Sequence, residues 1–204
     1  MLLYAIRHGQ SMDNFLRRYS GWSSAPLSEK GREDARRAGL LLQGIHFDKI
    51  YASPLARARE TCLIASGEAN PILHDDLKEI SVGSLQGILR EDAYKRWPER
   101  YPYANTQRDY TAWGGEDHDM HTARVIRFMK EMEAEPADET VAVFCHDGTI
   151  KAMLSHTLGI NIPARQLFLN NGAICVFEYS DGKWILSRWN VIMNEEGKPC
   201  VSAQ

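Results

Sequence analysis

Residues suited to binding and transferring a phosphoryl group occur twice in this chain directly after apolar, strand-like runs. Arg7-His8-Gly9 follows the apolar run 2–6, so this tripeptide should lie at the carboxyl end of a buried strand. His146-Asp147 follows the apolar run 141–145 in the same way. Alone, an Arg-His pair at a strand end is usually solvated surface, so the functional interpretation depends on what else reaches the same place.

Other polar residues are expected at the same edge of the fold. The carboxyl ends of parallel strands open on one crevice, which collects Ser53 and Arg57 after the short run 49–52. Glu79, which comes shortly after Ile72-Leu73, is expected to join them. Guanidinium groups match phosphate oxygens in bidentate geometry. The sequence therefore predicts a pocket for a small phosphorylated metabolite.

The residue types in this pocket suggest a two-step reaction. Neutral imidazole has a free lone pair near neutral pH, so a histidine such as His8 could carry the phosphoryl group as a phosphoramidate. Glu79 would protonate the leaving alkoxide if burial raised its pKa, and would later accept a proton from water. Arginines supply the transition-state charge, so we expect neither a metal nor another cofactor.

The elements that must position these residues alternate between strands and helices. We expect strands over residues 2–7, 49–52, 140–145, 173–179 and 183–190. We expect helices over 28–43 with Ser28 as N-cap, from Ser53 as N-cap with Pro54 in the first turn, and from Thr149 to Leu158. Asp181-Gly182 indicates a hairpin. The fold class expected is α/β: a three-layer αβα sandwich with a mainly parallel central sheet and an antiparallel edge.

Residues 88–113 interrupt this alternation, because they are rich in Arg, Tyr and Trp and lack a buried-strand pattern. We expect a small cap insertion over the site, and an excursion whose aromatic residues pack on the sheet edge is the alternative. The length of 204 residues suits a single domain, 1–204, that includes this insertion.

The composition narrows the class of protein. It is 44% hydrophobic and 25% charged with a net charge of −3, which is typical of a globular protein and does not favour nucleic acid. Four separated cysteines without a CxxC pair indicate reduced thiols. We expect a cytoplasmic protein with no membrane partner, and the sequence is compatible with a homo-oligomer. His118 and His121 are spaced like a metal pair, but the acidic start of a helix is the favoured interpretation.

Several short motifs follow one another in a fixed order. They are Arg7-His8-Gly9-Gln10-Ser11 with Asn14, Ser20-Gly21-Trp22 with Pro26-Leu27-Ser28, Ser53-Pro54-Leu55-Ala56-Arg57, Leu77-Lys78-Glu79-Ile80, Gly114-Gly115-Glu116, and Phe144-Cys145-His146. Together they resemble the histidine phosphatase superfamily, also called the phosphoglycerate mutase-like family. The similarity is to a phosphatase-type member of the branch that contains the cofactor-dependent phosphoglycerate mutases, and it covers about residues 1–180.

The resemblance implies a role for each matching residue. His8 would be the phosphohistidine nucleophile and Glu79 the proton donor. Phosphate ligands would be Arg7, Arg57 and His146, and the substrate side would be lined by Asn14, Ser20 and Gly21. Asp147 is the alternative proton donor, because an Asp in that place has this role in the acid phosphatase and phytase branch.

Three functions are compatible with these residues. The favoured one is a metal-independent phosphomonoesterase that works through phospho-His8. Phosphoglycerate mutase is the alternative, supported by Ser20-Gly21-Trp22. Mutases of the family carry a longer insertion than residues 88–113, and a mutase must keep water from its intermediate, so a short cap favours hydrolysis. The third, a catalytically silent phosphate-binding module, predicts the loss of at least one of His8, Arg57, Glu79 or His146, and the chain has all four.

Overall fold

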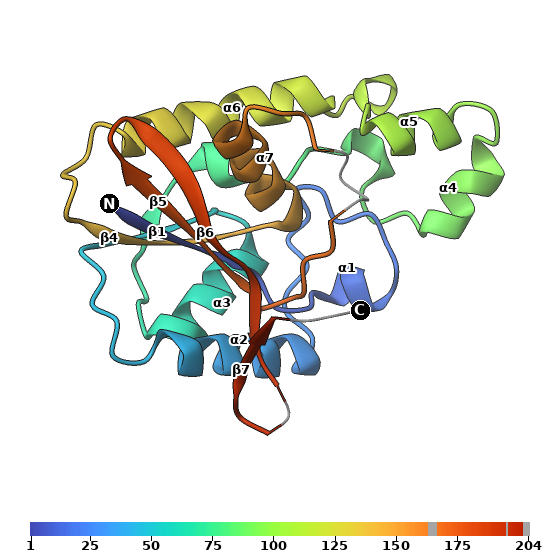
Figure 1. Cartoon of the computed structure of the whole chain (residues 1–204). Coiled ribbons are helices and arrows are strands. Elements are labelled where there is room, and N and C mark those ends of the chain that lie inside the picture. The colour runs from blue at the N-terminus through green and yellow to red at the C-terminus, as the bar shows by residue number, and fades with distance from the viewer. Residues whose placement is uncertain (163–166, 195, 202–204) are drawn as a thin grey trace.

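A seven-stranded sheet with the order β3-β2-β4-β1-β5-β6-β7 forms the centre of the molecule (Figure 1). This computed structural model describes residues 1–162, 167–194 and 196–201. The strands are β1 (Leu2–Arg7), β2 (Lys49–Ala52), β3 (Ile72–Leu73), β4 (Thr140–Cys145), β5 (Ile174–Ser180), β6 (Lys183–Met193) and β7 (Pro199–Val201). The predicted α/β class is confirmed, with one refinement. β1 to β4 pair with one another in parallel. β5, β6 and the unpredicted β7 add three antiparallel pairings, as many as the parallel ones.

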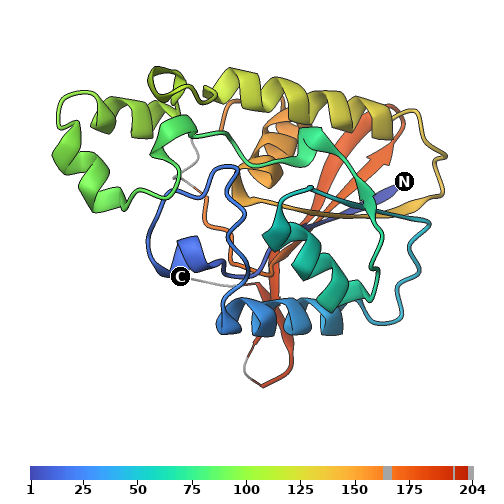
Figure 2. The same ribbon diagram turned by 180° about the vertical axis from the view of Figure 1, so that it is seen from behind.

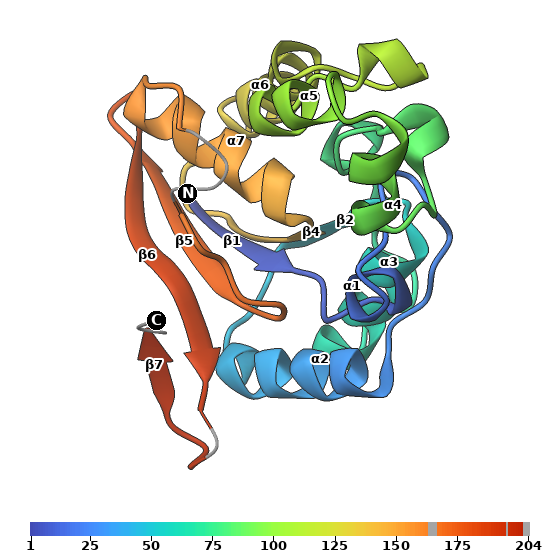
Figure 3. The same ribbon diagram turned by 90° about the vertical axis from the view of Figure 1, so that its right-hand side faces the viewer.

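Helices cover both faces of the sheet (Figure 3). On one face, Leu3 and Ala5 of β1 pack with the apolar sides of α6 (His118–Met132) and α7 (Asp147–Leu158). On the other face, Ile6 packs with α2 (Glu29–Leu42) and α3 (Ala56–Ser66). Successive residues of a strand point to opposite faces, so the nearly continuous apolar run of β1 can fill two cores at once.

Several predicted element boundaries are confirmed. Ser28 caps α2, since its hydroxyl accepts a hydrogen bond from the backbone N–H of Gly31 at 3.1 Å. The hairpin between β5 and β6 turns at Asp181-Gly182, where both residues have positive φ, 52° and 74°. This is the backbone geometry that a two-residue turn between antiparallel strands requires.

Two helix starts differ from the prediction, and both lie at the edge where the strands end. α3 begins at Ala56 after an N-cap residue, Leu55, that supplies no side-chain cap, instead of being capped by Ser53. The hydroxyl of Ser53 is hydrogen-bonded to His146 instead, at 2.8 Å. α7 begins at Asp147, directly after β4, and not at Thr149. Ser53 and Asp147 therefore both lie at the crevice formed by the strand ends.

Residues 88–113 form two short helices, α4 (Arg90–Arg96) and α5 (Tyr101–Gln107), and a 3₁₀ turn, Thr111–Trp113. Figures 1 and 2 show them projecting beyond the sheet. Tyr101, Tyr110 and Trp113 are buried together in a third apolar cluster that also includes Tyr19. These aromatic side chains pack the segment onto the loop before α2 rather than onto the sheet edge.

Neither a long apolar helix nor a disulfide is found in the described ranges. Within those residues, no helix has the length and apolar character needed to cross a membrane. Cys62, Cys145 and Cys175 are buried free thiols, as predicted, while Cys200 is half-buried.

Gly9, the residue after His8, touches the first turn of α2. A β-carbon at Gly9 would lie 2.1 Å from the carbonyl oxygen of Gly31, which is backbone and cannot swing aside. We expect Gly9→Ala to lower the free energy of unfolding by about 3 kcal/mol or more, measured by urea denaturation. The control is Gly44→Ala, where φ is +79° and no atom of the described residues lies within 4 Å of the added β-carbon, so only backbone strain of about 1 kcal/mol applies. Equal losses in the two variants would contradict this account.

Candidate active site

A cavity of about 290 Å³ opens at the carboxyl ends of β1 and β4. The structure brings together at this cavity most of the residues that the sequence predicted for it. Those lining it are Arg7, His8, Asn14, Ser20, Gly21, Arg57, Glu79 and Asp147. His146 does not line the cavity but lies against His8, with the two ring centroids 5.1 Å apart.

Two hydrogen bonds fix the tautomer of His8. Its Nδ1 lies 2.6 Å from the carbonyl oxygen of Gly9, which can only accept, so Nδ1 carries the proton. The Nε of Arg57 lies 3.2 Å from Nε2 of His8, and a guanidinium N–H can only donate, so Nε2 holds a lone pair. Burial, with the charges of Arg57 and Arg7, keeps the pKa of His8 well below its ordinary value. His8 is therefore neutral and nucleophilic at Nε2.

Arg57 is a buried cation with no carboxylate in ion-pair contact among the described residues. Besides His8, its guanidinium donates to the carbonyl oxygens of Gly21 at 2.8 Å and Ser23 at 3.3 Å. Burial lowers its pKa to about 10, which leaves it charged near neutral pH. A buried guanidinium that faces only neutral acceptors is an electrostatic site for an anion.

His146 occupies the N-cap position of α7 without a side-chain capping bond, and it is fully buried. Its Nε2 is 2.8 Å from the hydroxyl of Ser53, and its Nδ1 has no partner among the described residues. Burial, together with the charge of Arg57, holds the pKa of His146 well below its ordinary value. Both histidines of the site are therefore neutral.

Glu79 accepts hydrogen bonds on both carboxylate oxygens. Oε1 accepts from the backbone N–H of Ile80 at 2.9 Å and from Arg108 at 3.3 Å, and Oε2 accepts from the N–H of Gly148 at 3.1 Å. Burial favours a raised pKa, but Arg108, the two backbone N–H groups and Arg57 together lower the pKa of Glu79 below its ordinary value. This differs from the expectation that burial would prevail: without substrate, Glu79 is an ionised carboxylate.

Asp147, the alternative proton donor, sits in a different electrostatic setting. Its carboxylate is 2.9 Å from Nζ of Lys151, one turn further along α7, and 3.8 Å from the guanidinium of Arg7. Arg7 also donates to the carbonyl oxygen of Leu169, while its Nε is buried without a partner among the described residues. Asp147 thus anchors one of the cavity's cations.

Asn14, Ser20 and Gly21 line the cavity from the segment between β1 and α2. Asn14 closes a capping box with Ser11: its Oδ1 accepts from the N–H of Ser11 at 3.2 Å, and its own N–H donates to the Ser11 hydroxyl. Gly21 has a φ of +46°, and a β-carbon there would lie 2.6 Å from Val82. These constraints hold the loop that supplies two of the acceptors for Arg57.

The sequence analysis missed several residues of the 88–113 segment and its surroundings that line the cavity: Tyr19, Arg90, Asn105, Arg108 and Tyr110. The sequence analysis noted only that residues 88–113 are rich in Arg, without singling out Arg90. Arg108 has a φ of +56°, in the left-handed region, and this turn after α5 directs its side chain to Glu79. No motif marks it, because its contact depends on how the segment folds back.

Arg124 was missed as well, although it organises the loop that carries Glu79. Its guanidinium donates to the carbonyl oxygens of Asp76 at 2.9 Å, Lys78 at 2.6 Å and Glu79 at 2.9 Å. Its charge is balanced by Glu116, whose Oε1 lies 2.9 Å from Nε. One sequence signal could have indicated Arg124: it lies among the apolar positions of the helix that follows Gly114-Gly115-Glu116, where a buried arginine needs a partner.

The histidines considered as a metal pair do not meet. His118 is hydrogen-bonded to Asn161 at 3.0 Å, and His121 is buried beside Gly148. Asp117 caps α6, with its side chain accepting from the N–H of Met120, as an acidic helix start predicts. Among the described residues, no group of three or more His, Cys, Asp or Glu side chains is arranged to hold a metal ion.

Comparison with known proteins identifies the family. The model of the histidine phosphatase superfamily (branch 1) matches residues 3–192. The chain belongs to this superfamily. A 2,3-bisphosphoglycerate-dependent phosphoglycerate mutase from Parvibaculum lavamentivorans is 30% identical over 207 residues, which cover 95% of this chain and 98% of that protein.

Solved structures with the same fold carry phosphatase names. The α-ribazole phosphatase from Shigella flexneri superposes with a TM-score of 0.83 at 23% identity, covering 93% of this chain and 96% of that one. A mycobacterial glucosyl-3-phosphoglycerate phosphatase superposes with a TM-score of 0.79 at 24% identity, covering 93% and 98%. At these identities the solved structures show only the shared fold. Membership of the superfamily, shown by the family model and the mutase relative, indicates an enzyme that is a phosphatase or a mutase.

The contact between Arg108 and Glu79 has a direct consequence for titration. Arg108→Gln removes a cation beside the carboxylate, so the pKa of Glu79 should rise in the substrate-free protein, as followed by carbon NMR of labelled glutamate side chains. Arg96→Gln, which removes a cap arginine away from the cavity, is the matched control and should leave the pKa of Glu79 in place. An unchanged pKa in Arg108→Gln would show that the backbone donors alone hold the carboxylate ionised.

Proposed function

We propose that this member of the histidine phosphatase superfamily is a metal-independent phosphomonoesterase that hydrolyses a small phosphorylated metabolite. The observation that carries the proposal is the contact between Arg57 and His8. A buried guanidinium that forms no ion pair with a described carboxylate donates to the lone pair of a neutral imidazole whose other nitrogen is hydrogen-bonded to Gly9. A phosphoryl group entering this place meets both a cation for its oxygens and a nucleophile for phosphorus.

In the first step, Nε2 of His8 attacks phosphorus and the bond to the ester oxygen breaks. Arg57 moves its hydrogen bond from Nε2 to a phosphoryl oxygen, which frees the lone pair at the moment it is needed. Arg7, whose Nε has no partner among the described residues, binds a second oxygen. Their positive charges stabilise the charge on the transferring group, so the step does not depend on a metal ion.

The leaving alkoxide requires a proton, which we assign to Glu79. Glu79 is ionised in the empty site, but a phosphate dianion competes for Arg108 and Arg57, the two cations that lower its pKa. Loss of these cations and the added negative charge raise the pKa of Glu79, so substrate binding itself favours the acid form. Asp147 is instead paired with Lys151, which does not line the cavity, and it lies against Arg7, which we assign to phosphate binding.

Water completes the reaction by attacking phosphorus. Glu79 accepts the proton of the water as the bond from phosphorus to Nε2 of His8 breaks, which releases inorganic phosphate and restores neutral His8. The exposed side chain of Arg90 lies at the rim of the cavity, so solvent reaches the site. The length of the 88–113 segment does not by itself separate hydrolysis from mutase activity. The Parvibaculum mutase aligns over 98% of its length and therefore has no much longer insertion. Solvent access is the property that favours hydrolysis.

The nucleophile is tested with p-nitrophenyl phosphate in the presence of EDTA. His8→Ala should lower kcat at least about a thousandfold, because removing a covalent nucleophile typically costs several orders of magnitude. His46→Ala is the control, since the side chain of His46 is 90% exposed and remote from the cavity. Activity that survives His8→Ala, or that EDTA abolishes in the wild type, would overturn the mechanism. The wild type is also given 3-phosphoglycerate: efficient conversion to 2-phosphoglycerate with little phosphate release would establish a mutase instead.

The proton donor is tested by varying the leaving group. Glu79→Gln should reduce kcat about a hundredfold or more on alkyl phosphates and far less on p-nitrophenyl phosphate, because a phenolate departs with little protonation. Asp147→Asn is the matched carboxylate variant and should affect both esters alike. The reverse pattern, with the leaving-group dependence in Asp147→Asn, would move the role to Asp147.

A further inference from the structure

Asp13 is a buried carboxylate that the proposed mechanism does not use. It lies in the first turn of α1 (Met12–Phe15) and is only 7% exposed. Among the described residues, one side chain binds its carboxylate: the hydroxyl of Ser23 donates to Oδ2 at 2.5 Å. No described cation lies within ion-pair distance of it. A buried carboxylate with a single donor is costly, so a positive charge further away is needed to stabilise it.

Ser23 connects Asp13 to Arg57. The hydroxyl of Ser23 holds the carboxylate, while its carbonyl oxygen accepts from Nη1 of Arg57 at 3.3 Å. The turn that carries Ser23 is closed by a hydrogen bond from its N–H to the carbonyl oxygen of Ser20 at 2.8 Å. One residue thus holds the carboxylate by its side chain and the guanidinium by its backbone, and keeps the two charges apart.

The charge of Asp13 acts on Arg57 across this residue. Burial lowers the pKa of Arg57 most, whereas Glu79 and Asp13 both raise it. In the proposed reaction, Glu79 has taken up the proton of the attacking water by the time free phosphate forms. Asp13 is then the carboxylate near Arg57 that stays charged. In a poorly solvated site its charge acts well beyond contact distance.

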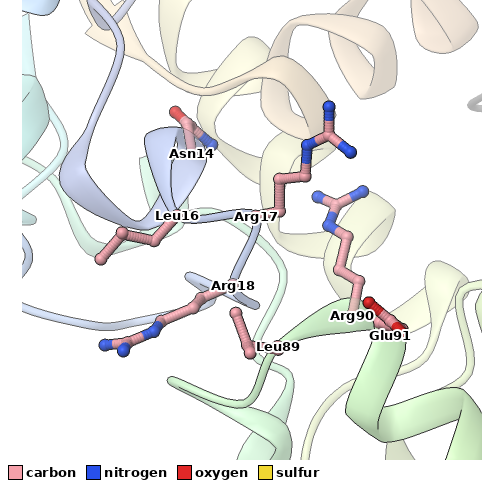
Figure 4. Close-up of a pocket in the computed structure, with 7 residues that line it drawn as sticks. All are labelled: Asn14, Leu16, Arg17, Arg18, Leu89, Arg90 and Glu91. Carbon is pink, nitrogen blue, oxygen red and sulfur yellow. The ribbon is translucent and has the colours of Figure 1, made fainter.

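The product of the reaction is itself a strong ligand for this site. Phosphate released from His8 keeps the negative oxygens that Arg57 binds in the substrate. A buried guanidinium without any counter-charge would retain this product, and slow product release limits turnover in many enzymes. The way out leads past α1, because Asn14, the residue after Asp13, lines both the cavity of His8 and an adjoining cavity of about 600 Å³ (Figure 4).

We propose that Asp13 is a positioning residue for Arg57: held in place by Ser23, its negative charge weakens the binding of product phosphate and speeds its release. The proposal rests on the proposed phosphatase function and concerns its last step. A carboxylate beyond the Ser23 carbonyl repels the anion that Arg57 attracts, so phosphate binds less tightly than to Arg57 alone. Separation by Ser23 also prevents a direct ion pair, which would occupy the N–H groups that phosphate needs.

The test measures the binding of inorganic phosphate by calorimetry, which needs no turnover. Asp13→Asn removes the charge but keeps an oxygen that can accept from Ser23, so the Kd for phosphate should fall about threefold or more. Asp48→Asn is the matched control, because Asp48 directly precedes β2, at the opposite edge of the sheet, and accepts from the N–H of Thr140. It should leave the Kd unchanged. Ser23→Ala keeps the charge and should not tighten binding.

Kinetics with p-nitrophenyl phosphate add a readout that a merely structural role would not produce. Asp13→Asn should lower KM without raising kcat, because substrate and product are both held more tightly. A site that had only been loosened would show the opposite change, a higher KM.

An unchanged or higher Kd for phosphate in Asp13→Asn would overturn the proposal. Equal tightening in Ser23→Ala would do the same, since it would assign the effect to the loop and not to the charge. If Asp13→Asn does not fold, Asp13→Ser also removes the charge and carries the same expectation. A wild type that binds phosphate but hydrolyses no ester contradicts the phosphatase proposal, and the comparison of Kd values still decides the role of Asp13. A wild type that binds no phosphate overturns both.

Discussion

The parallel pairing of β1 with β4 is the constraint on which the site depends. Arg7 lies opposite Cys145, and the N–H of His8 donates to the carbonyl oxygen of Cys145 at 3.0 Å, so the next residue of each strand emerges at the same level. This register places the ring of His8 beside that of His146. It also places the N-terminus of α7, which begins at Asp147, at the end of β4 next to the cavity. A shift by one residue would turn His8 toward a core face. The chemistry is therefore built into the central strand pair.

Charge in the cavity is governed by a competition between burial and a few fixed partners. Burial prevails at His8 and His146 and keeps both imidazoles neutral, whereas hydrogen-bond donors prevail at Glu79 and keep its carboxylate ionised. Arg57 remains charged although buried, and no described carboxylate pairs with it. The empty site thus carries surplus positive charge around one neutral nucleophile. An anionic substrate relieves this imbalance, and its arrival changes the protonation that the next step requires.

The sequence predicted those parts of the molecule that depend on local pattern. Apolar runs predict the central strands, and the rule for strand ends predicts that His8, Arg57, Glu79 and His146 lie in one place. Features that depend on tertiary contacts could not be predicted. Ser53 matches a helix cap locally, yet its hydroxyl serves His146. Arg108 reaches the cavity through backbone with positive φ, and β7 exists as a strand because β6 extends beyond β5 to pair with it.

The entry and exit of the 88–113 segment are held together by one reciprocal contact. The N–H of Glu116 donates to the carbonyl oxygen of Ser81 at 2.9 Å, and the N–H of Ser81 donates to the Glu116 carboxylate at 2.8 Å. Arg124 binds that same carboxylate and the backbone carrying Glu79, so the junction closes at the proton donor. Everything between the two ends is a closed loop that can lengthen or shorten at small entropic cost without moving the sheet. The helices of this segment can therefore change in length without moving the sheet, whereas a change that removes Arg108 also removes the cation beside Glu79.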